Sequence, residues 1–460
     1  MKKFIYLVTF GLLAISACKR DVAIDVNPAY KLNFSTDSIL FDTVFTSIGS
    51  TSRSIKVFNL SKSDIQISNI RLVGGATSPF KININGVAQS SVNDIRLNGK
   101  DSIYVFVKAV IDPNQANAPF LVQDTLEFLT NGNLQKIPVV AYGQNAIYLN
   151  SKTLEADYVF KKNLPYLIFN YVEIAKNKKA SIEPGARLYF HSGAEMNVYG
   201  TLAANGSLTD TITFCSDRTE RIYRDEPGQW KGVHFFKTSI DNTLNYCTVK
   251  NAIVGLRVDS LSDDFKPKLL ITNSIIKNHT IAGLMAYTAH IVGINNLIYN
   301  CGKHLMIGLY GGTYEFYQNT FANSSNNFSR QTPSVVFSDN TEDGLLRYKK
   351  LNIIFTNNIV WGNADSEFLI NSANSSLLNA SIQTNLLKTT LFNNASDNVI
   401  NQDPLFQDVK KDNYFLAVNS PSQNAGTDLS ANFYYNKFIK TDLKNVLRGF
   451  PSDLGCFEVR

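Results

Sequence analysis

Acidic side chains, which could bind a metal ion or act as general acid and base, gather in only a few places in this chain. Asp259, Asp263 and Asp264 stand close together, whereas residues 265–314 contain neither Asp nor Glu. A glycoside hydrolase needs two facing carboxylates, and a polysaccharide lyase needs a basic residue together with carboxylates that hold Ca²⁺. Because the middle of the chain lacks these groups, the sequence predicts no catalytic residue.

A second acidic run, from Asp339 to Gly344, has part of the spacing of a Ca²⁺-binding loop. Asp339, Asp343 and Gly344 match that spacing, but Thr341 and Lys350 stand where such a loop needs oxygen ligands from acidic side chains. The sequence therefore predicts no metal site, and Ca²⁺ is the one cofactor that stays open.

Aromatic residues of the same region could stack on sugar rings. Tyr287, Tyr310 and Tyr314 lie in strand-like runs, where a side chain faces either the core or the solvent. Together with Asp259, Asp263 and Asp264 they are the predicted binding residues. The alternative for each aromatic residue here, Tyr299 and Phe316 included, is a place in the core.

Other sequence motifs of catalysis and of metal or nucleotide binding are absent. The chain contains no GxxxxGK[ST], HExxH, GxSxG or GxGxxG motif. His279, His290 and His304 lack the spacing of metal ligands, and a repeat of 22 residues would place Cys301 beside His279. We therefore expect structural roles for these histidines.

Length and composition indicate a large β-rich protein with at least two parts. The chain has 460 residues, of which 12% are aromatic and 18% charged, and its formal net charge is +6. A single core rarely serves so long a chain. The basic residues are too scattered to predict a nucleic-acid partner.

The N-terminus is predicted to be a targeting segment that ends in a lipid anchor. Lys2 and Lys3 precede the apolar run Phe4–Ile15, which is shorter than the ~20 apolar residues of a membrane-spanning helix. Ile15-Ser16-Ala17-Cys18 resembles the lipobox of bacterial lipoproteins. The resemblance implies a signal peptide over residues 1–17, acylation of Cys18, a lipid bilayer as partner, and a place at the outer membrane or cell surface. A plain secretory signal is the alternative.

Residues 182–236 predict the main fold. Short strand-like runs alternate with turn pairs such as Pro184-Gly185, so the chain must turn a corner every few residues. The stretch resembles the entry of right-handed parallel β-helix (pectate-lyase-like) proteins through Ile182, Leu188, Phe190, Gly200, Leu202, Ala204, Gly206, Ile212, Phe214, Trp230, Gly232 and Val233. The fold class implied is all-β, with this solenoid over residues 182–400.

An asparagine spacing continues the pattern. Asn251, Asn278, Asn300, Asn323 and Asn363 follow one another at intervals of 27, 22, 23 and 40 residues. Asparagine tolerates left-handed φ and its amide can bridge stacked backbone groups. We expect these five residues to stack at one corner of the repeat.

The remaining parts follow from similar patterns. Residues 18–29 are predicted to be a linker, and residues 30–143 an antiparallel β-sandwich, with Asn131-Gly132 as a hairpin turn. The run from Arg53 to Gly75 resembles Hydin-type immunoglobulin-like domains. Residues 144–181 are expected to connect the two domains and cap the solenoid, and residues 401–460 resemble the C-terminal cap of secreted β-helix proteins.

Two functions stay open at this point. The first is a membrane-anchored surface lipoprotein without catalytic activity, one face of which binds a polysaccharide or a partner protein. The second is a polysaccharide lyase or glycoside hydrolase acting on an acidic polysaccharide, which the family resemblance alone favours.

Overall fold

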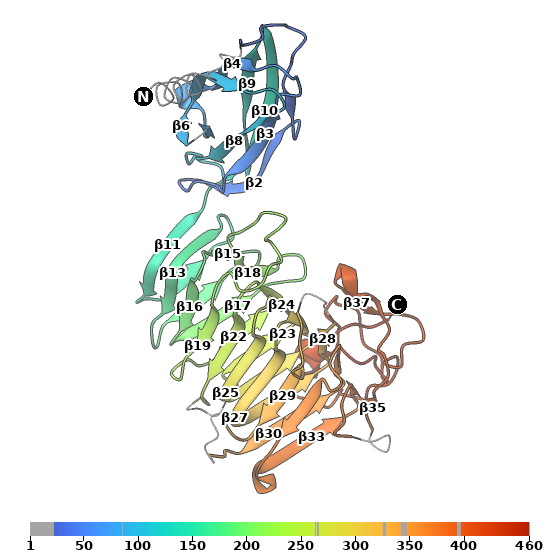
Figure 1. Cartoon of the computed structure of the whole chain (residues 1–460). Coiled ribbons are helices and arrows are strands. Elements are labelled where there is room, and N and C mark those ends of the chain that lie inside the picture. The colour runs from blue at the N-terminus through green and yellow to red at the C-terminus, as the bar shows by residue number, and fades with distance from the viewer. Residues whose placement is uncertain are drawn as a thin grey trace, which may run out of the picture. The chain divides into compact units, whose positions relative to one another are not determined.

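The computed structural model describes residues 23–84, 86–262, 264, 266–324, 328–341, 347–392 and 397–459. The chain is all-β and divides into two compact units, residues 1–145 and 146–460 (Figure 1). Cys18 and Asp263 lie outside the described residues. No described helix combines the length and the apolar character that crossing a membrane requires.

The first unit contains two five-stranded sheets that enclose one apolar core. All neighbouring strands are antiparallel except one parallel pair, β2 with β10. One sheet has the order β1 (Asn33–Phe34), β3 (Arg53–Phe58), β8 (Ser102–Ala109), β5 (Phe80–Ile84) and β6 (Val87–Gln89). The other has the order β2 (Ile39–Phe45), β10 (Asn133–Gln144), β9 (Phe120–Thr130), β4 (Ile65–Leu72) and β7 (Ser91–Leu97).

The second unit is built on a large parallel sheet in which strands three apart in the chain are paired. From β15 to β24 the chain visits three ladders in turn, which we call ladders A, B and C. It then continues through the long strands β25 (Ala282–Ile294) and β27 (His304–Tyr317), each of which serves ladder B and then ladder C. One passage through the three ladders is called a repeat below.

The strands of the ladders are short. Ladder A contains β15 (Arg187–Phe190), β18 (Ile212–Ser216), β21 (Cys247–Lys250), β24 (Ile275–His279), β26 (Leu297–Cys301), β28 (Thr320–Asn323), β31 (Ile359–Gly362), β34 (Leu386–Leu387) and β35 (Val399–Ile400). Ladder B contains β16 (Glu195–Val198), β19 (Gly232–Phe235), β22 (Val254–Asp259), β29 (Val335–Ser338) and β32 (Phe368–Asn371). Ladder C contains β12 (Tyr158–Phe160), β14 (Lys179–Ile182), β17 (Thr201–Asn205), β20 (Asn242–Asn245), β23 (Leu269–Thr272), β30 (Leu351–Thr356) and β33 (Leu378–Gln383).

Residues 144–181, expected as a connector and cap, carry strands of the parallel sheet. β11 (Ile147–Leu154) pairs in parallel with β13 (Tyr166–Ile174), and β13 pairs with β15 and then with β16. After ladder C ends, a short antiparallel pair follows, β36 (Phe406–Asp408) with β37 (Asn413–Leu416). Four short helical segments complete the described elements: Gly75–Thr77, Ser375–Leu377, Val409–Lys411 and Tyr435–Ile439.

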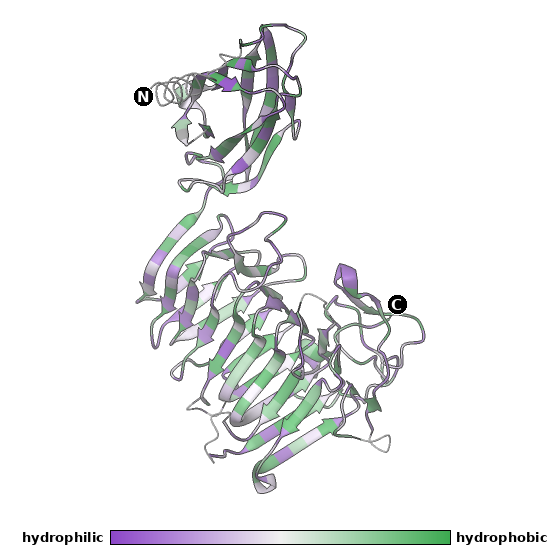
Figure 2. Cartoon of the chain, in the orientation of Figure 1, coloured by the Kyte–Doolittle hydropathy of each residue, from purple (hydrophilic) through white to green (hydrophobic). Residues whose placement is uncertain are grey.

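One apolar core collects inward side chains from all three ladders, because alternate residues of each strand point to the same face. Figure 2 shows hydrophobic residues concentrated on the strands of this unit between β22 and β33. The four cysteines of the second unit, Cys215, Cys247, Cys301 and Cys456, are buried free thiols. His279 is paired in register with Cys301, as the 22-residue spacing predicts.

A ladder of buried amides runs where the chain passes from ladder C to ladder A. The backbone N–H of Asn296 donates to Asn319 Oδ1 at 3.0 Å, that of Asn319 to Asn358 Oδ1 at 2.8 Å, and that of Asn358 to Asn385 Oδ1 at 2.8 Å. Each side-chain amide also donates to a backbone carbonyl of an adjacent repeat, for example Asn358 Nδ2 to the Phe316 carbonyl at 2.9 Å. These bonds satisfy polar backbone groups that would otherwise be buried without partners.

The asparagines predicted to stack lie at another corner, between ladders A and B. Asn251, Asn278 and Asn300 do adopt positive φ values of 69°, 58° and 53°. Asn323 is not among the residues with positive φ, but its side chain exchanges two hydrogen bonds with the backbone of Cys301 in the preceding repeat, which is the predicted bridging role. The amide ladder thus uses a different set of residues from the one that the spacing picks out.

Replacing Asn358 with alanine should destabilise the second unit by about 2–3 kcal/mol, because the Asn319 N–H and the Phe316 carbonyl would remain buried without these partners. Tryptophan fluorescence during urea unfolding measures this, since both tryptophans, Trp230 and Trp361, belong to this unit. Asn379→Ala, at an exposed position of β33, is the matched control, with an expected change below about 0.5 kcal/mol. Equal midpoints for the two variants would contradict the assigned role of the ladder.

Buried His279 should make the second unit sensitive to acid. Burial lowers the pKa of His279 from 6.5 to about 4, and its ring nitrogens contact the Ala252 N–H and the Val249 carbonyl. Between pH 6.5 and 4 the unfolded chain is protonated at this residue while the folded chain is not, so stability falls as the pH drops. From pH 7 to pH 5 this amounts to about 2 kcal/mol.

The measurement compares the pH dependence of urea midpoints in the wild-type protein and in His279→Gln, which keeps a neutral donor and acceptor. Glutamine does not titrate, so the variant should lose about 2 kcal/mol less between pH 7 and pH 5. The quantity compared is the change in stability between pH 7 and pH 5, and not the stability of the variant at one pH. Identical slopes would show that His279 is not the acid-sensitive group.

Candidate functional site

Three of the predicted binding residues meet at the end of ladder B strands. Asp259 is the last residue of β22 and is paired in register with Tyr287 of β25, which in turn is paired with Leu309 of β27. Tyr310 follows directly and has a φ of 58°. Parallel pairing thus brings together residues that are far apart in the sequence.

A bend in the chain opens the surface at this point. Ser260, Thr288 and Tyr310 all have positive φ, with values of 69°, 49° and 58°, where the chain leaves ladder B. Thr288 Oγ1 donates a hydrogen bond of 2.7 Å to the Tyr310 carbonyl and so links two neighbouring bends. β27 carries one more residue than β25 here, a bulge that turns the Tyr310 side chain outward.

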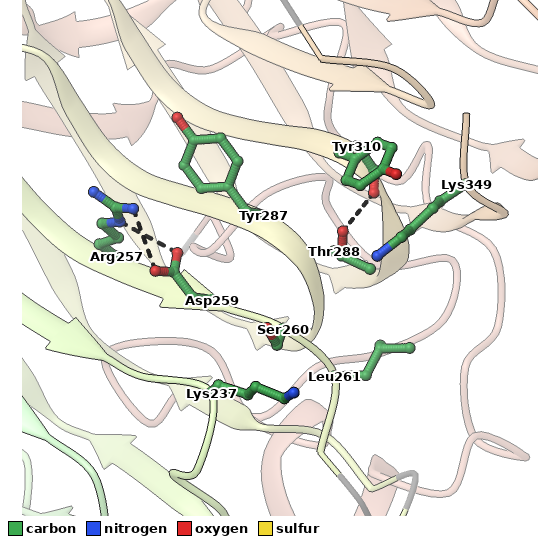
Figure 3. Close-up of a pocket in the computed structure, with 9 residues that line it drawn as sticks. All are labelled: Lys237, Arg257, Asp259, Ser260, Leu261, Tyr287, Thr288, Tyr310 and Lys349. Atoms are coloured by element: carbon green, nitrogen blue, oxygen red, sulfur yellow. Dashed lines mark hydrogen bonds and ion pairs between the residues drawn. The ribbon is translucent and has the colours of Figure 1, made fainter. Parts of the chain in front are cut away.

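The bends border a hollow with a volume of about 540 Å³, which we call the ladder B pocket (Figure 3). Such a volume lies within the usual range of ligand pockets. Its lining includes three cationic side chains, two tyrosines and one carboxylate. The lining residues are Lys237, Arg257, Asp259, Ser260, Leu261, Tyr287, Thr288, Tyr310 and Lys349.

The single carboxylate of the described lining, Asp259, is held by two partners. Arg257 donates two hydrogen bonds of 3.2 Å to its oxygens, and His234 Nε2 lies 2.7 Å from Oδ2. Partial burial acts to raise the pKa of Asp259, but the bonds from His234 and Arg257 outweigh it and hold the pKa below its usual value. Asp259 is therefore ionised at neutral pH and serves as a hydrogen-bond acceptor.

Cations also lie beside both tyrosine rings. The Arg257 guanidinium carbon lies 5.2 Å from the centre of the Tyr287 ring, and Lys349 Nζ lies 4.5 Å from the centre of the Tyr310 ring. Such cation–π contacts fix the orientation of the rings. With Lys237 on another side, the described lining carries three positive charges and one negative charge (Figure 3).

Tyr314, a predicted binding residue, lies in the core instead. It is fully buried, and its hydroxyl donates to the Gly311 carbonyl at 3.0 Å, so it cannot contact a ligand at the surface. Phe316 is likewise in the core, and Tyr299 is covered by the C-terminal segment through Tyr414 and Asp412. Asp264 is exposed and pairs with Lys266 at 3.3 Å, outside the described lining of the pocket.

The Asp339 run does not present a calcium loop in its described part. Asp339 is buried, and its carboxylate accepts hydrogen bonds from Ser372 Oγ, the Ala373 N–H and the Asn374 N–H at 2.8–3.1 Å. Glu342, Asp343 and Gly344 lie outside the described residues. Among the residues that are described, no three His, Cys, Asp or Glu side chains come together as metal ligands would.

Sequence reasoning missed most of the polar contributors to this site, Arg257 included. Lys237, Thr288 and Lys349 stand in unremarkable contexts, and His234 carries no ligand spacing. Strand register, which the sequence does not show directly, brings such residues to the site. For example, His234 is paired with Arg257, two residues before Asp259. Lys349 reaches the pocket from a segment between ladders B and C of a later repeat.

No protein-family model and no curated protein sequence matches this chain. Among solved structures it is similar to the ASH/PapD-like domain 7 of human CEP192, at 10% identity and a TM-score of 0.18 over 28% of this chain and 96% of that domain. The E. coli chaperone DraB matches at 10% identity and a TM-score of 0.18, over 24% of this chain and 54% of DraB. A protein of unknown function from Porphyromonas gingivalis W83 matches at 14% identity and a TM-score of 0.19, over 27% of this chain and 60% of that protein. Each of these three similarities covers less than a third of this chain.

Proposed function

We propose that this chain is a lipid-anchored protein of the outer membrane or cell surface whose ladder B pocket binds an acidic polysaccharide without cleaving it. In this proposal Cys18 carries the lipid and residues 30–143 form a Hydin-like immunoglobulin-fold spacer. The parallel strands of the second unit close into a right-handed β-helix, and its outer face at ladder B is the binding surface.

The pairing of strands supports the β-helix part of the proposal. Strands join ladders A, B and C in the same order in successive repeats, and one core contains inward residues of all three ladders. A sheet whose strands return to the same three ladders must turn on itself between them. The amide ladder places a further repeated bond at one of these turns.

The observation that carries the binding part is the pairing of tyrosines with cations in the ladder B pocket. Tyr287 and Tyr310 offer rings on which a sugar can stack, and Asp259 offers oxygens for its hydroxyl groups. Arg257, Lys237 and Lys349 add positive charge around them. This combination favours a sugar that carries a carboxylate or a sulfate, because its charge would be compensated there.

The way in which the polar groups are used supports binding without cleavage. The Asp259 carboxylate is engaged by His234 and Arg257, and the described lining contains no second carboxylate to act with it. A lyase that relies on Ca²⁺ needs several carboxylate oxygens around the ion, and a hydrolase needs an acid and a base. The lyase or hydrolase alternative would therefore require groups beyond those described.

Tyr287→Ala and Lys349→Ala should each weaken binding of acidic oligosaccharides by about three- to tenfold, because one removes a stacking surface and the other a positive charge. Isothermal titration with fragments of pectate, alginate and glycosaminoglycans measures this, and affinity should fall with added salt. Phe433→Ala, at a residue that is 90% exposed and belongs to the C-terminal segment, is the matched control. Absorbance of unsaturated products should stay flat with the same sugars; a calcium-dependent rise would establish the lyase instead.

Cys18→Ala should abolish lipid attachment, because the thiol is the predicted acylation site. The variant should no longer incorporate labelled palmitate and should leave the membrane fraction for the soluble fraction. A variant with Cys215→Ala, which removes a buried thiol, should label as the wild-type protein does. Unchanged labelling and fractionation of Cys18→Ala would reject the lipid anchor.

A further inference from the structure

A row of four side chains extends from the ladder B pocket across successive repeats. Tyr199, Phe236, Asp259 and Tyr287 occupy equivalent places, because Val198 is paired with Phe235, Phe235 with Val258, and Asp259 with Tyr287. All four members are partly exposed. We call this set the ladder B row.

Contacts between the members make the row continuous. The rings of Tyr199 and Phe236 stack with centres 4.2 Å apart and planes 15° from parallel, and Phe236 lies against the His234 ring at 3.7 Å. His234 in turn contacts Asp259, which belongs to the ladder B pocket. Aromatic surface therefore continues from the pocket over two further repeats.

Charge changes along the row. The pocket end carries Arg257, Lys237 and Lys349 against one described carboxylate. The other end carries carboxylates, since Glu173 is paired in register with Asn197, two residues before Tyr199, and Glu195 belongs to the same strand β16. Lys231 pairs with Glu195 at 3.1 Å, which compensates one of those two carboxylates.

We propose that the ladder B row binds one extended glycan chain that crosses the strands, with an anionic sugar in the pocket and neutral sugars over Phe236 and Tyr199. The inference rests on the proposed function and adds the length, direction and charge pattern of the ligand. Neighbouring strands lie ~4.8 Å apart, which is close to the length that one pyranose residue adds to an extended glycan. Each repeat can therefore contact one sugar of the chain.

The same charges disfavour a uniform polyanion. A chain with a carboxylate on every sugar would bring negative charge toward Glu173, where like charges repel, whereas Lys231 compensates Glu195. A chain with its anionic residue at the pocket and uncharged residues beyond it meets opposite charge at one end and aromatic faces at the other. The ligand class is thus a mixed glycan in which acidic sugars are spaced among neutral ones.

The test uses xylo-oligosaccharides of two to six sugars that each carry a single glucuronate, titrated into the full mature chain. Affinity should rise about tenfold from the shortest to the pentamer and then level off, because the row together with Tyr310 spans about five repeats. Phe236→Ala should lower the affinity for the pentamer about fivefold and leave the shortest ligand unchanged. Phe433→Ala should change neither, and an oligo-uronate of equal length should bind more weakly than the pentamer.

The outcomes separate the inference from the function beneath it. If short and long ligands bind equally and Phe236→Ala has no effect, the row is not a binding track, while loss of binding in Tyr287→Ala would still uphold the pocket. If the fully charged oligo-uronate binds more tightly than the mixed ligand, the charge pattern proposed here is wrong. If no ligand binds the wild-type protein, the proposed function itself is rejected.

Discussion

Buried amide groups at the passage from ladder C to ladder A set the register on which the second unit depends. At the passages into β26, β28, β31 and β34 a backbone N–H points inward, and an asparagine side chain of the next repeat accepts its hydrogen bond. The residue before each of these asparagines has a positive φ, as at Asn295, Gln318, Asn357 and Thr384. Because a shift of one residue would break all these bonds together, each repeat is locked onto its neighbour.

Register then decides which side chains become neighbours at the surface. Asp259 and Tyr287 are 28 positions apart in the chain, yet they are paired directly in ladder B. His234 is paired with Arg257, two residues before Asp259, which explains how a histidine reaches Asp259 from another strand. The site is thus assembled by backbone pairing between strands, and its residues do not form a local sequence motif by which it could be recognised.

The sequence carries much of the fold and part of the site. Turn pairs such as Pro184-Gly185 and the short apolar runs predict the parallel strands, and Asp259, Tyr287 and Tyr310 were predicted on residue type alone. The prediction that Tyr314 binds a ligand was wrong for a physical reason. Tyr310 and Tyr314 are four apart and would share one face of a regular strand, but positive φ at Tyr310, Gly311 and Gly312 reverses that alternation and sends Tyr314 into the core. The asparagine spacing correctly picks out equivalent places in successive ladder A strands. It does not find the amide ladder, because all corners of a repeat share one period and spacing alone does not distinguish them.

The spacing of the ladder B row has one more consequence. The spacing of neighbouring strands and the length of one sugar residue are close but unequal, so the offset between the row and an extended glycan grows with every repeat. In the proposed complex, a sugar ring centred over one residue of the row would leave the next ring slightly off centre over the next residue, and after several steps a ring would fall between two residues. A single straight row can therefore keep only a few rings in phase, and a protein of this design that had to grip a longer polymer would need several short rows with free glycan between them.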